Sequence, residues 1–253
     1  MRFLLRLFGE ESAFGRFLIR LYILIVSNLL FVLFSIPVIT TGASLSALNY
    51  TLMKLQRGDR HFKVFDTFWK GFKENFVKAT ICFVALVALV MFQILEISWC
   101  RQFSGMMALF QYALAGLMTL EVIVAIYLFP VIAAFNGGIG ELLKNALYFA
   151  FSKPLRMLAC LVLNVVPLAA TYVFVAYLPL WAFLWLMFGF AAVAYASTHI
   201  MLAQFVPFLP QVDICGDIIP PGMEDDPNIV VGDQDSADDP DDKTLQEMMK
   251  YGL

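Results

Sequence analysis

Residues 21–53, LYILIVSNLLFVLFSIPVITTGASLSALNYTLM, contain no charged side chain. A helix needs about 20 apolar residues to cross the hydrocarbon core of a bilayer, so this stretch is too long for one crossing. Pro37 gives it a natural break, because proline lacks the backbone donor that a helix interior needs. The stretch therefore predicts a helical hairpin with arms at residues 17–38 and 43–56, of which the second is shorter and more polar.

The composition extends this prediction to most of the chain. Of its 253 residues, 61% are hydrophobic and 15% are charged, whereas a soluble domain has roughly 45–50% apolar and about 25% charged residues. A water-soluble globular fold is therefore excluded as the default. Further apolar runs predict an all-α, polytopic transmembrane bundle of about six crossings in three hairpins, within a membrane domain at 1–210; these runs are 79–100, 107–135, 155–177 and 180–207.

The net charge of -3 is the sum of two opposite regions. Residues 1–210 carry fifteen Lys or Arg and eight Asp or Glu, which gives +7. Residues 211–253 carry two basic and twelve acidic residues, which gives -10. An acidic segment with prolines and little to bury is typical of disorder. We predict a disordered tail at 211–253, with a short terminal helix over 244–250.

The basic residues also predict an orientation in the cell membrane. Cytoplasmic loops are enriched in Lys and Arg, and residues 54–78 hold seven of them. With six crossings and the N-terminus inside, this loop is cytoplasmic and only Arg101 faces out. If the 43–56 arm did not cross, the loop would lie outside and violate the rule. Both termini are therefore predicted to be cytoplasmic.

Residues 61–78 combine aromatic and basic side chains at helical spacing. This pattern predicts a helix lying at the lipid headgroups, with its apolar side down and its basic side toward anionic lipid. Residues 3–8 and 141–151 are shorter versions of the same pattern. The acidic tail is an alternative partner for the basic loop. The predicted headgroup or partner contacts are Lys63, Lys70, Lys73, Lys78 and Trp69.

The N-terminal third resembles a known family. Residues 28–44, NLLFVLFSIPVITTGAS, followed by KLQRG at 54–58, resemble the opening of the YesL-like family of bacterial membrane proteins. FWKGFKENF at 68–76 resembles that family's aromatic and basic loop. The resemblance implies a role near carbohydrate uptake, with components of a sugar transporter or a cytoplasmic protein as partners. It implies no reaction and no ligand, and it does not extend to the acidic tail.

Polar side chains inside the predicted crossings are the candidate functional residues. Glu121 lies about halfway along the fourth crossing, where an ionisable group is costly and marks a pathway, a cavity or a helix contact. It is either a protonatable group in an internal cavity or a neutral acid bonded to a neighbouring helix. Asn28 and Asn164 are predicted to bond between helices or to line a path. His199 is either a group that titrates near neutral pH and lines the path or, as we expect, a hydrogen-bonded core histidine.

The sequence lacks the common motifs of catalysis. It has no phosphate-binding glycine loop, no His-Glu-x-x-His motif and no nucleophile elbow, and its four cysteines show no pairwise spacing. We therefore expect no enzyme, cofactor, metal site or nucleic-acid partner. The predicted function is an accessory or regulatory component of carbohydrate uptake. The alternative is a small-solute transporter whose path is lined by Glu121 and Asn28.

Overall fold

The computed structural model describes residues 13–57, 62–100, 102 and 106–208. The predictions for the acidic tail, for residues 3–8 and for Arg101 lie outside these residues. Within them, every regular element is helical and there is no strand. In chain order the elements are α2 (Ala13–Phe34), η1 (Val38–Thr40), α3 (Thr41–Gln56), α4 (Val64–Cys100), α5 (Met106–Ala134), α6 (Ile139–Ser152), α7 (Pro154–Val173), η2 (Val175–Tyr177), α8 (Leu178–Leu184), η3 (Trp185–Gly189), α9 (Phe190–Phe205) and η4 (Val206–Phe208).

Five described segments are long and apolar enough to cross a membrane, which confirms an all-α polytopic bundle. The sixth predicted crossing, residues 43–56, belongs to α3. At 16 residues, or about 24 Å, α3 is shorter than a typical span, and most of its side chains are buried within the protein. The five candidate spans are Phe14–Phe34, Val64–Cys100, Leu109–Ala134, Pro154–Val173 and Val175–Phe208.

The predicted break at Pro37 is present and separates α2 from α3. Helix α2 ends at Phe34, and the 3-10 turn η1 follows Pro37. The single O–H of Thr40 is shared between the carbonyl oxygens of Phe34, at 2.6 Å, and of Pro37, at 2.7 Å. These bonds satisfy main-chain acceptors that a helix end leaves open. The chain can therefore reverse direction here without exposing those acceptors.

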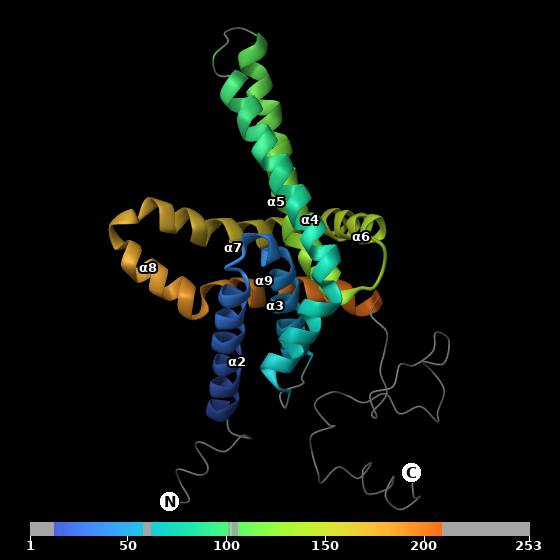
Figure 1. Cartoon of the computed structure of the whole chain (residues 1–253), viewed down its shortest axis with the longest axis vertical. Coiled ribbons are helices and arrows are strands. Elements are labelled where there is room, and N and C mark those ends of the chain that lie inside the picture. Colours follow the sequence, from blue (N-terminus) through green and yellow to red (C-terminus); the bar gives the residue numbers. More distant parts are fainter. Residues whose placement is uncertain (1–12, 58–61, 101, 103–105, 209–253) are drawn as a thin grey trace, which may run out of the picture.

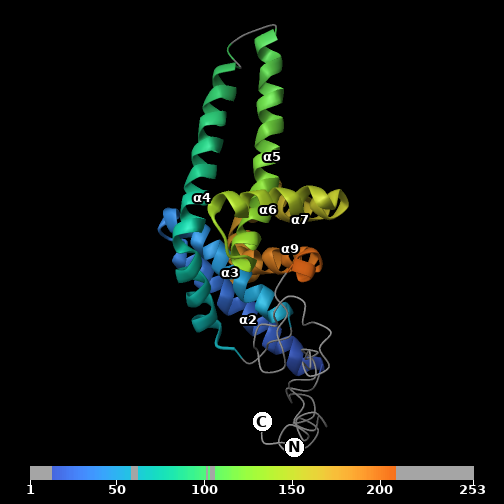
Figure 2. The same ribbon diagram turned by 90° about the vertical axis from the view of Figure 1, so that its right-hand side faces the viewer.

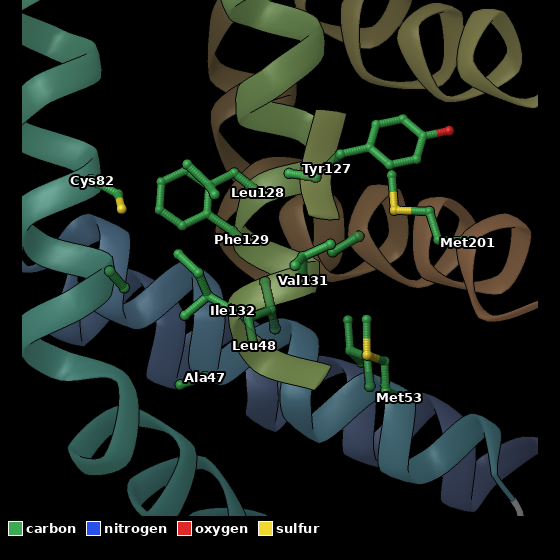
Figure 3. Packing of buried hydrophobic residues seen from close by; sticks show 14 of the residues in the cluster. Ala47, Leu48, Met53, Cys82, Tyr127, Leu128, Phe129, Val131, Ile132 and Met201 are labelled. Carbon is green, nitrogen blue, oxygen red and sulfur yellow. The ribbon is translucent and has the colours of Figure 1, made fainter. Parts of the chain in front are cut away.

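The helices are arranged around α3. The α4–α5 hairpin projects beyond the other helices, whereas α6, α7 and α9 run crosswise to it (Figures 1 and 2). The centre of the core lies where α3 meets α5, with Leu48 close to Ile132 (Figure 3). Three of the four cysteines, Cys82, Cys100 and Cys160, are buried free thiols; Cys215 lies outside the described residues.

Two glycines allow α3 and α4 to approach closely. A Cβ added to Gly42 of α3 would lie 2.5 Å from both the Ala79 carbonyl oxygen and the Phe83 Cβ of α4. A Cβ added to Gly71 of α4 would lie 2.9 Å from the Tyr50 ring of α3. Small residues at such contacts let helix backbones pack closely in membranes. The glycines thus determine how close these two helices can lie.

The aromatic and basic segment at 61–78 differs from its prediction. It is not a separate interfacial helix, because α4 runs without a break from Val64 to Cys100. Its apolar face packs against protein: the Phe68 and Phe72 rings lie 5.7 and 5.2 Å from the Phe34 ring of α2. The aromatic spacing was correctly interpreted as helical, but the buried part of this face packs against α2 and α3, while Phe65 and Phe76 stay exposed.

The predicted segment at 141–151 forms α6, with a different inner face. Leu142, Ala146 and Phe149 are buried, whereas Leu143 and Phe151 are exposed. Phe149 stacks on Phe135, with ring centroids 5.6 Å apart. The face of α6 that packs against the protein core is therefore the one with Leu142, Ala146 and Phe149. Leu143 and Phe151 therefore remain available to the surroundings of the bundle.

Candidate functional site

A pocket of about 210 Å³ lies between four helices, α3, α5, α7 and α9. Its walls are mostly apolar, with three polar side chains from three different helices: Asn49, Asn164 and Ser197. An apolar pocket with a few convergent polar groups is the usual form of a small-molecule site. The other lining residues are Leu45, Ala125, Ile126, Phe129, Pro130, Leu168, Trp185, Phe190, Val193 and Ala194.

Hydrogen bonds hold the polar side chains of the pocket in place. The Asn164 amide nitrogen donates to the Ser197 hydroxyl at 2.9 Å and to the Cys160 carbonyl oxygen at 2.8 Å. The Asn49 amide nitrogen donates to the Leu45 carbonyl oxygen at 2.8 Å. Asn164 thereby links α7 to α9, the interhelical role predicted for it, while also lining the pocket.

Pro130 adds a main-chain acceptor beside the pocket. It lies inside α5, where its lack of an N–H leaves the carbonyl of Ile126 without the usual helical donor. Both residues line the pocket. A ligand with a hydrogen-bond donor could use this carbonyl together with the side chains of Asn49 and Asn164.

Asn28 lies away from the pocket and bonds to η3, a single turn of π-helix. Its amide nitrogen donates to the carbonyl oxygens of Trp185, at 3.0 Å, and Leu186, at 2.7 Å. Its carbonyl oxygen accepts from the Ala191 N–H at 2.9 Å. A π-turn shifts the helical hydrogen-bond register, and Asn28 supplies partners for the displaced groups. The side chain is fully buried.

Glu121 makes a contact between α4 and α5. The Gln93 amide nitrogen donates a hydrogen bond of 2.6 Å to the Glu121 carboxyl. Gln93 is only 3% exposed, and Glu121 is not among the pocket residues. The second carboxyl oxygen of Glu121 and the amide oxygen of Gln93 have no partner.

His199 differs from the prediction of a buried histidine. It is exposed on α9, while its neighbours Ser197, Thr198 and Met201 face the protein interior. The helical repeat places His199 on the opposite face. The structure therefore brings Asn164 alone of the four predicted polar residues to the pocket and places Glu121, Asn28 and His199 elsewhere.

The basic residues of α4 are available on the surface. Lys63, Lys70 and Lys73 are exposed, and Lys78 is half-buried. The Lys73 ammonium lies 5.0 Å from the centre of the Trp69 ring, a distance at which a cation is attracted to an aromatic face. The predicted headgroup or partner contacts thus form one side of a helix whose other side is buried.

Several polar residues that the structure brings together were missed in the sequence. Gln93 could have been recognised in the sequence as readily as Asn28, because both are amides inside apolar runs. Gln56 bonds α3 to α9 through the Tyr195 carbonyl oxygen at 2.7 Å, but its place at the end of an arm concealed this role. Among the described residues, no three His, Cys, Asp or Glu side chains gather as metal ligands would.

Comparison with known proteins gives one family match. Residues 24–97 match a family described as "Protein of unknown function, DUF624". The matched segment includes the second half of α2, all of α3 and nearly all of α4, and thus Asn28 and the glycines Gly42 and Gly71. The walls of the pocket from α5, α7 and α9 lie outside it. No curated protein and no solved structure matches the chain.

Proposed function

We propose that this protein is a non-enzymatic component of the cell membrane that assists carbohydrate uptake or its regulation. The observation that carries the proposal is the position of Glu121, which bonds to Gln93 between two helices and does not line the pocket. A helix contact is a structural use of an intramembrane carboxyl, and it leaves the transporter interpretation without its central ionisable group. The resemblance to the YesL-like family supplies the association with sugar uptake.

The contact surface in this proposal is the exposed side of the first part of α4. Lys70 and Lys73 are exposed there beside Trp69, and Phe65 is 53% exposed although it is aromatic. A rigid helix that presents cations and aromatic rings suits an acidic segment of a partner or an anionic lipid surface. In the proposed orientation α3, although short and buried, returns the chain to the side on which α2 begins. This surface and both termini are then cytoplasmic, where a regulatory partner would find them.

The second candidate function is small-solute transport. The observation in its favour is the pocket between α3, α5, α7 and α9 with its polar side chains. A path through this pocket would use Asn49, Asn164 and Ser197. It would replace the path first predicted along Glu121 and Asn28, because those two side chains bond to neighbouring helices.

The variant Glu121→Gln tests whether Glu121 couples solute movement to protons, as the path first predicted along Glu121 would require. A glutamine can still accept the bond from Gln93 and can donate one to its amide oxygen, so we expect the helix contact to persist while the titratable proton is removed. Reconstituted vesicles with a pH-sensitive dye would report proton uptake on addition of mono- and disaccharides. We expect no proton uptake with either protein, and co-purification with subunits of the host's sugar transporter unchanged by Glu121→Gln.

A charge-reversed variant, Lys70→Glu with Lys73→Glu, provides the positive control for the partner contact. Both side chains are exposed, so the fold should persist, and we expect the co-purified transporter subunits to decrease at least fivefold. Sugar-dependent proton uptake that Glu121→Gln abolishes would contradict the accessory role and favour transport. Co-purification that is unaffected by the charge reversal would exclude the α4 surface.

A further inference from the structure

The pocket between α3, α5, α7 and α9 offers hydrogen-bond acceptors that the protein itself leaves open. The side chains of Asn49 and Asn164 bond only through their amide nitrogens. Among the described residues, therefore, none donates a hydrogen bond to the carbonyl oxygen of either side chain. The main-chain carbonyl of Ile126 lacks its helical donor because Pro130 stands four residues further on. Three acceptors from three helices thus remain open on residues that line one cavity.

The pocket also offers a donor. The Ser197 hydroxyl accepts the bond from Asn164 at 2.9 Å, and within the described part of the chain it donates none. Its hydrogen is therefore available to a ligand in the pocket that the residue lines. A ligand group that both donates and accepts suits this mixture of open acceptors and a donor, and a hydroxyl is the simplest such group.

The polarity of the pocket restricts its occupant to a neutral molecule with few polar groups. None of the described residues that line it is charged, so an ion would lose its hydration there without gaining a counter-charge. A monosaccharide carries several hydroxyl groups, each able to donate once and to accept twice. The mostly apolar walls would leave many of these unpaired, which disfavours a sugar.

Two aromatic rings form a fixed apolar wall. The rings of Trp185 and Phe190 lie 4.7 Å apart and both residues line the pocket. The Trp185 indole N–H donates to the Thr171 hydroxyl at 3.0 Å, and the Phe190 ring packs 5.2 Å from that of Phe31 in α2. The wall is therefore held in place before a ligand arrives, and such rings pack well against another flat ring.

The volume of the pocket limits the size of the ligand. It holds about 210 Å³, whereas an apolar cavity of roughly 150 Å³ is enough to bind benzene. The pocket therefore has room for a single ring with one or two small substituents. A larger molecule would have to extend out of it.

We propose that this pocket binds a small neutral ring compound with one hydroxyl group, of the class of the phenols. The hydroxyl donates to one of the open carbonyl oxygens and accepts from Ser197, while the ring packs against Trp185 and Phe190. The inference goes beyond the accessory role and does not rest on it. A lipid chain would fill the apolar part of the pocket but leave the open acceptors unpaired, and the test below includes that outcome.

The test uses the full chain purified in an uncharged maltoside detergent, with 4-fluorophenol and 4-fluorotoluene as probes. The two probes have the same number of heavy atoms and differ only in a hydroxyl against a methyl group. Titration followed by fluorine NMR gives the Kd of each, corrected for its partition into empty micelles. We expect saturable binding, at least fivefold tighter for 4-fluorophenol, since each net hydrogen bond strengthens binding about twofold to tenfold.

Two substitutions locate the bound hydroxyl. Asn49→Leu keeps the size of the side chain and removes an open acceptor; the bond it loses lies within α3, so the fold should persist. We expect it to weaken 4-fluorophenol binding about fivefold and to change 4-fluorotoluene binding less than twofold. Ser197→Ala removes the donor and should weaken 4-fluorophenol binding about threefold. Asn145→Leu on the exposed side of α6 is the matched control and should leave both values unchanged.

Three outcomes would overturn the proposal. Equal corrected affinities for the two probes would show simple apolar filling, as by a lipid chain. An affinity for 4-fluorophenol that is unchanged in both Asn49→Leu and Ser197→Ala would place its binding elsewhere. Displacement of bound 4-fluorophenol by glucose would assign the pocket to a sugar. These measurements are independent of co-purification with transporter subunits, so a failure here is distinguished from a failure of the accessory role.

Discussion

Replacing Asn28 with leucine is expected to lower the free energy of unfolding by about 3–5 kcal/mol, because it leaves main-chain groups at the π-turn without partners. The affected groups are the carbonyls of Trp185 and Leu186 and the N–H of Ala191. Each buried group that loses its partner costs about 1–3 kcal/mol, and the larger apolar side chain offsets part of this. Chemical unfolding in mixed micelles measures the change.

The exposed amide Asn145 of α6 provides the control for this prediction. Asn145→Leu is expected to change stability by less than about 0.5 kcal/mol, as is usual for surface positions. Asn28→Asp provides a second comparison, since it keeps the acceptor for Ala191 but loses the donor for the two carbonyls. It should therefore also destabilise the protein. Equal stability of Asn28→Leu and the unaltered chain would show that α2 does not support η3 in the way described.

Replacing Gly42 with alanine is expected to lower the free energy of unfolding by about 2–3 kcal/mol. The added Cβ would lie 2.5 Å from the Ala79 carbonyl oxygen and from the Phe83 Cβ, and neither is the flexible end of a side chain that could move aside. Overpacking at such a contact costs about 1–3 kcal/mol, occasionally more. Relief requires α3 and α4 to separate, which would disturb the centre of the bundle.

Gly116→Ala is the matched control in α5. Nothing lies within 4 Å of a Cβ added there, and alanine favours a helix over glycine by about 1 kcal/mol. We expect Gly116→Ala to leave stability unchanged or to raise it. A Gly42→Ala protein as stable as Gly116→Ala would contradict the close α3–α4 contact. Thermal unfolding of both variants in one detergent makes the comparison.

The first hairpin could be predicted because its cause is local. Proline lacks a backbone donor, so Pro37 marks the break between α2 and α3 whatever surrounds it. The burial of α3 could not be predicted in this way. Its small and weakly polar residues, Ser44, Ser46 and Ala47 among them, suit close packing between helices. The enrichment of cytoplasmic loops in Lys and Arg, applied to the basic loop at 54–78, instead favoured an arm that crosses the membrane.

The long helix α4 shows a second limit of sequence patterns. The spacing of Phe68 and Phe72 predicts an apolar helical face, but the pattern is the same whether lipid or protein covers that face. The chain returns after Pro37, and this return brings Phe68 and Phe72 of α4 against Phe34 of α2. The same holds for the polar residues. The sequence shows that Glu121 is costly to place inside a membrane, but it does not show that the partner is Gln93, which lies 28 positions away.

The pocket was hidden for a related reason. Asn164 was recognisable because an amide inside a crossing is rare. Its placement on a pocket depended on Pro130 and on the crosswise course of α7, which can be followed in Figure 1.

Cysteine cross-linking between positions 93 and 121 tests the central claim most directly. The variant Gln93→Cys with Glu121→Cys, in a chain whose native cysteines are replaced and whose α4–α5 connection carries a protease site, is treated in isolated membranes with a short bifunctional thiol reagent. The reagent makes up the side-chain length that the two substitutions remove, because a direct disulfide needs closer Cβ atoms than a Gln–Glu contact provides. Gln93→Cys with Val122→Cys is the control, because Val122 is exposed. We predict that the cleaved halves stay joined for 93 with 121 and separate for 93 with 122. Halves that separate in both, together with fast labelling of Glu121→Cys by a charged thiol reagent, would place Glu121 on an aqueous path and contradict this account.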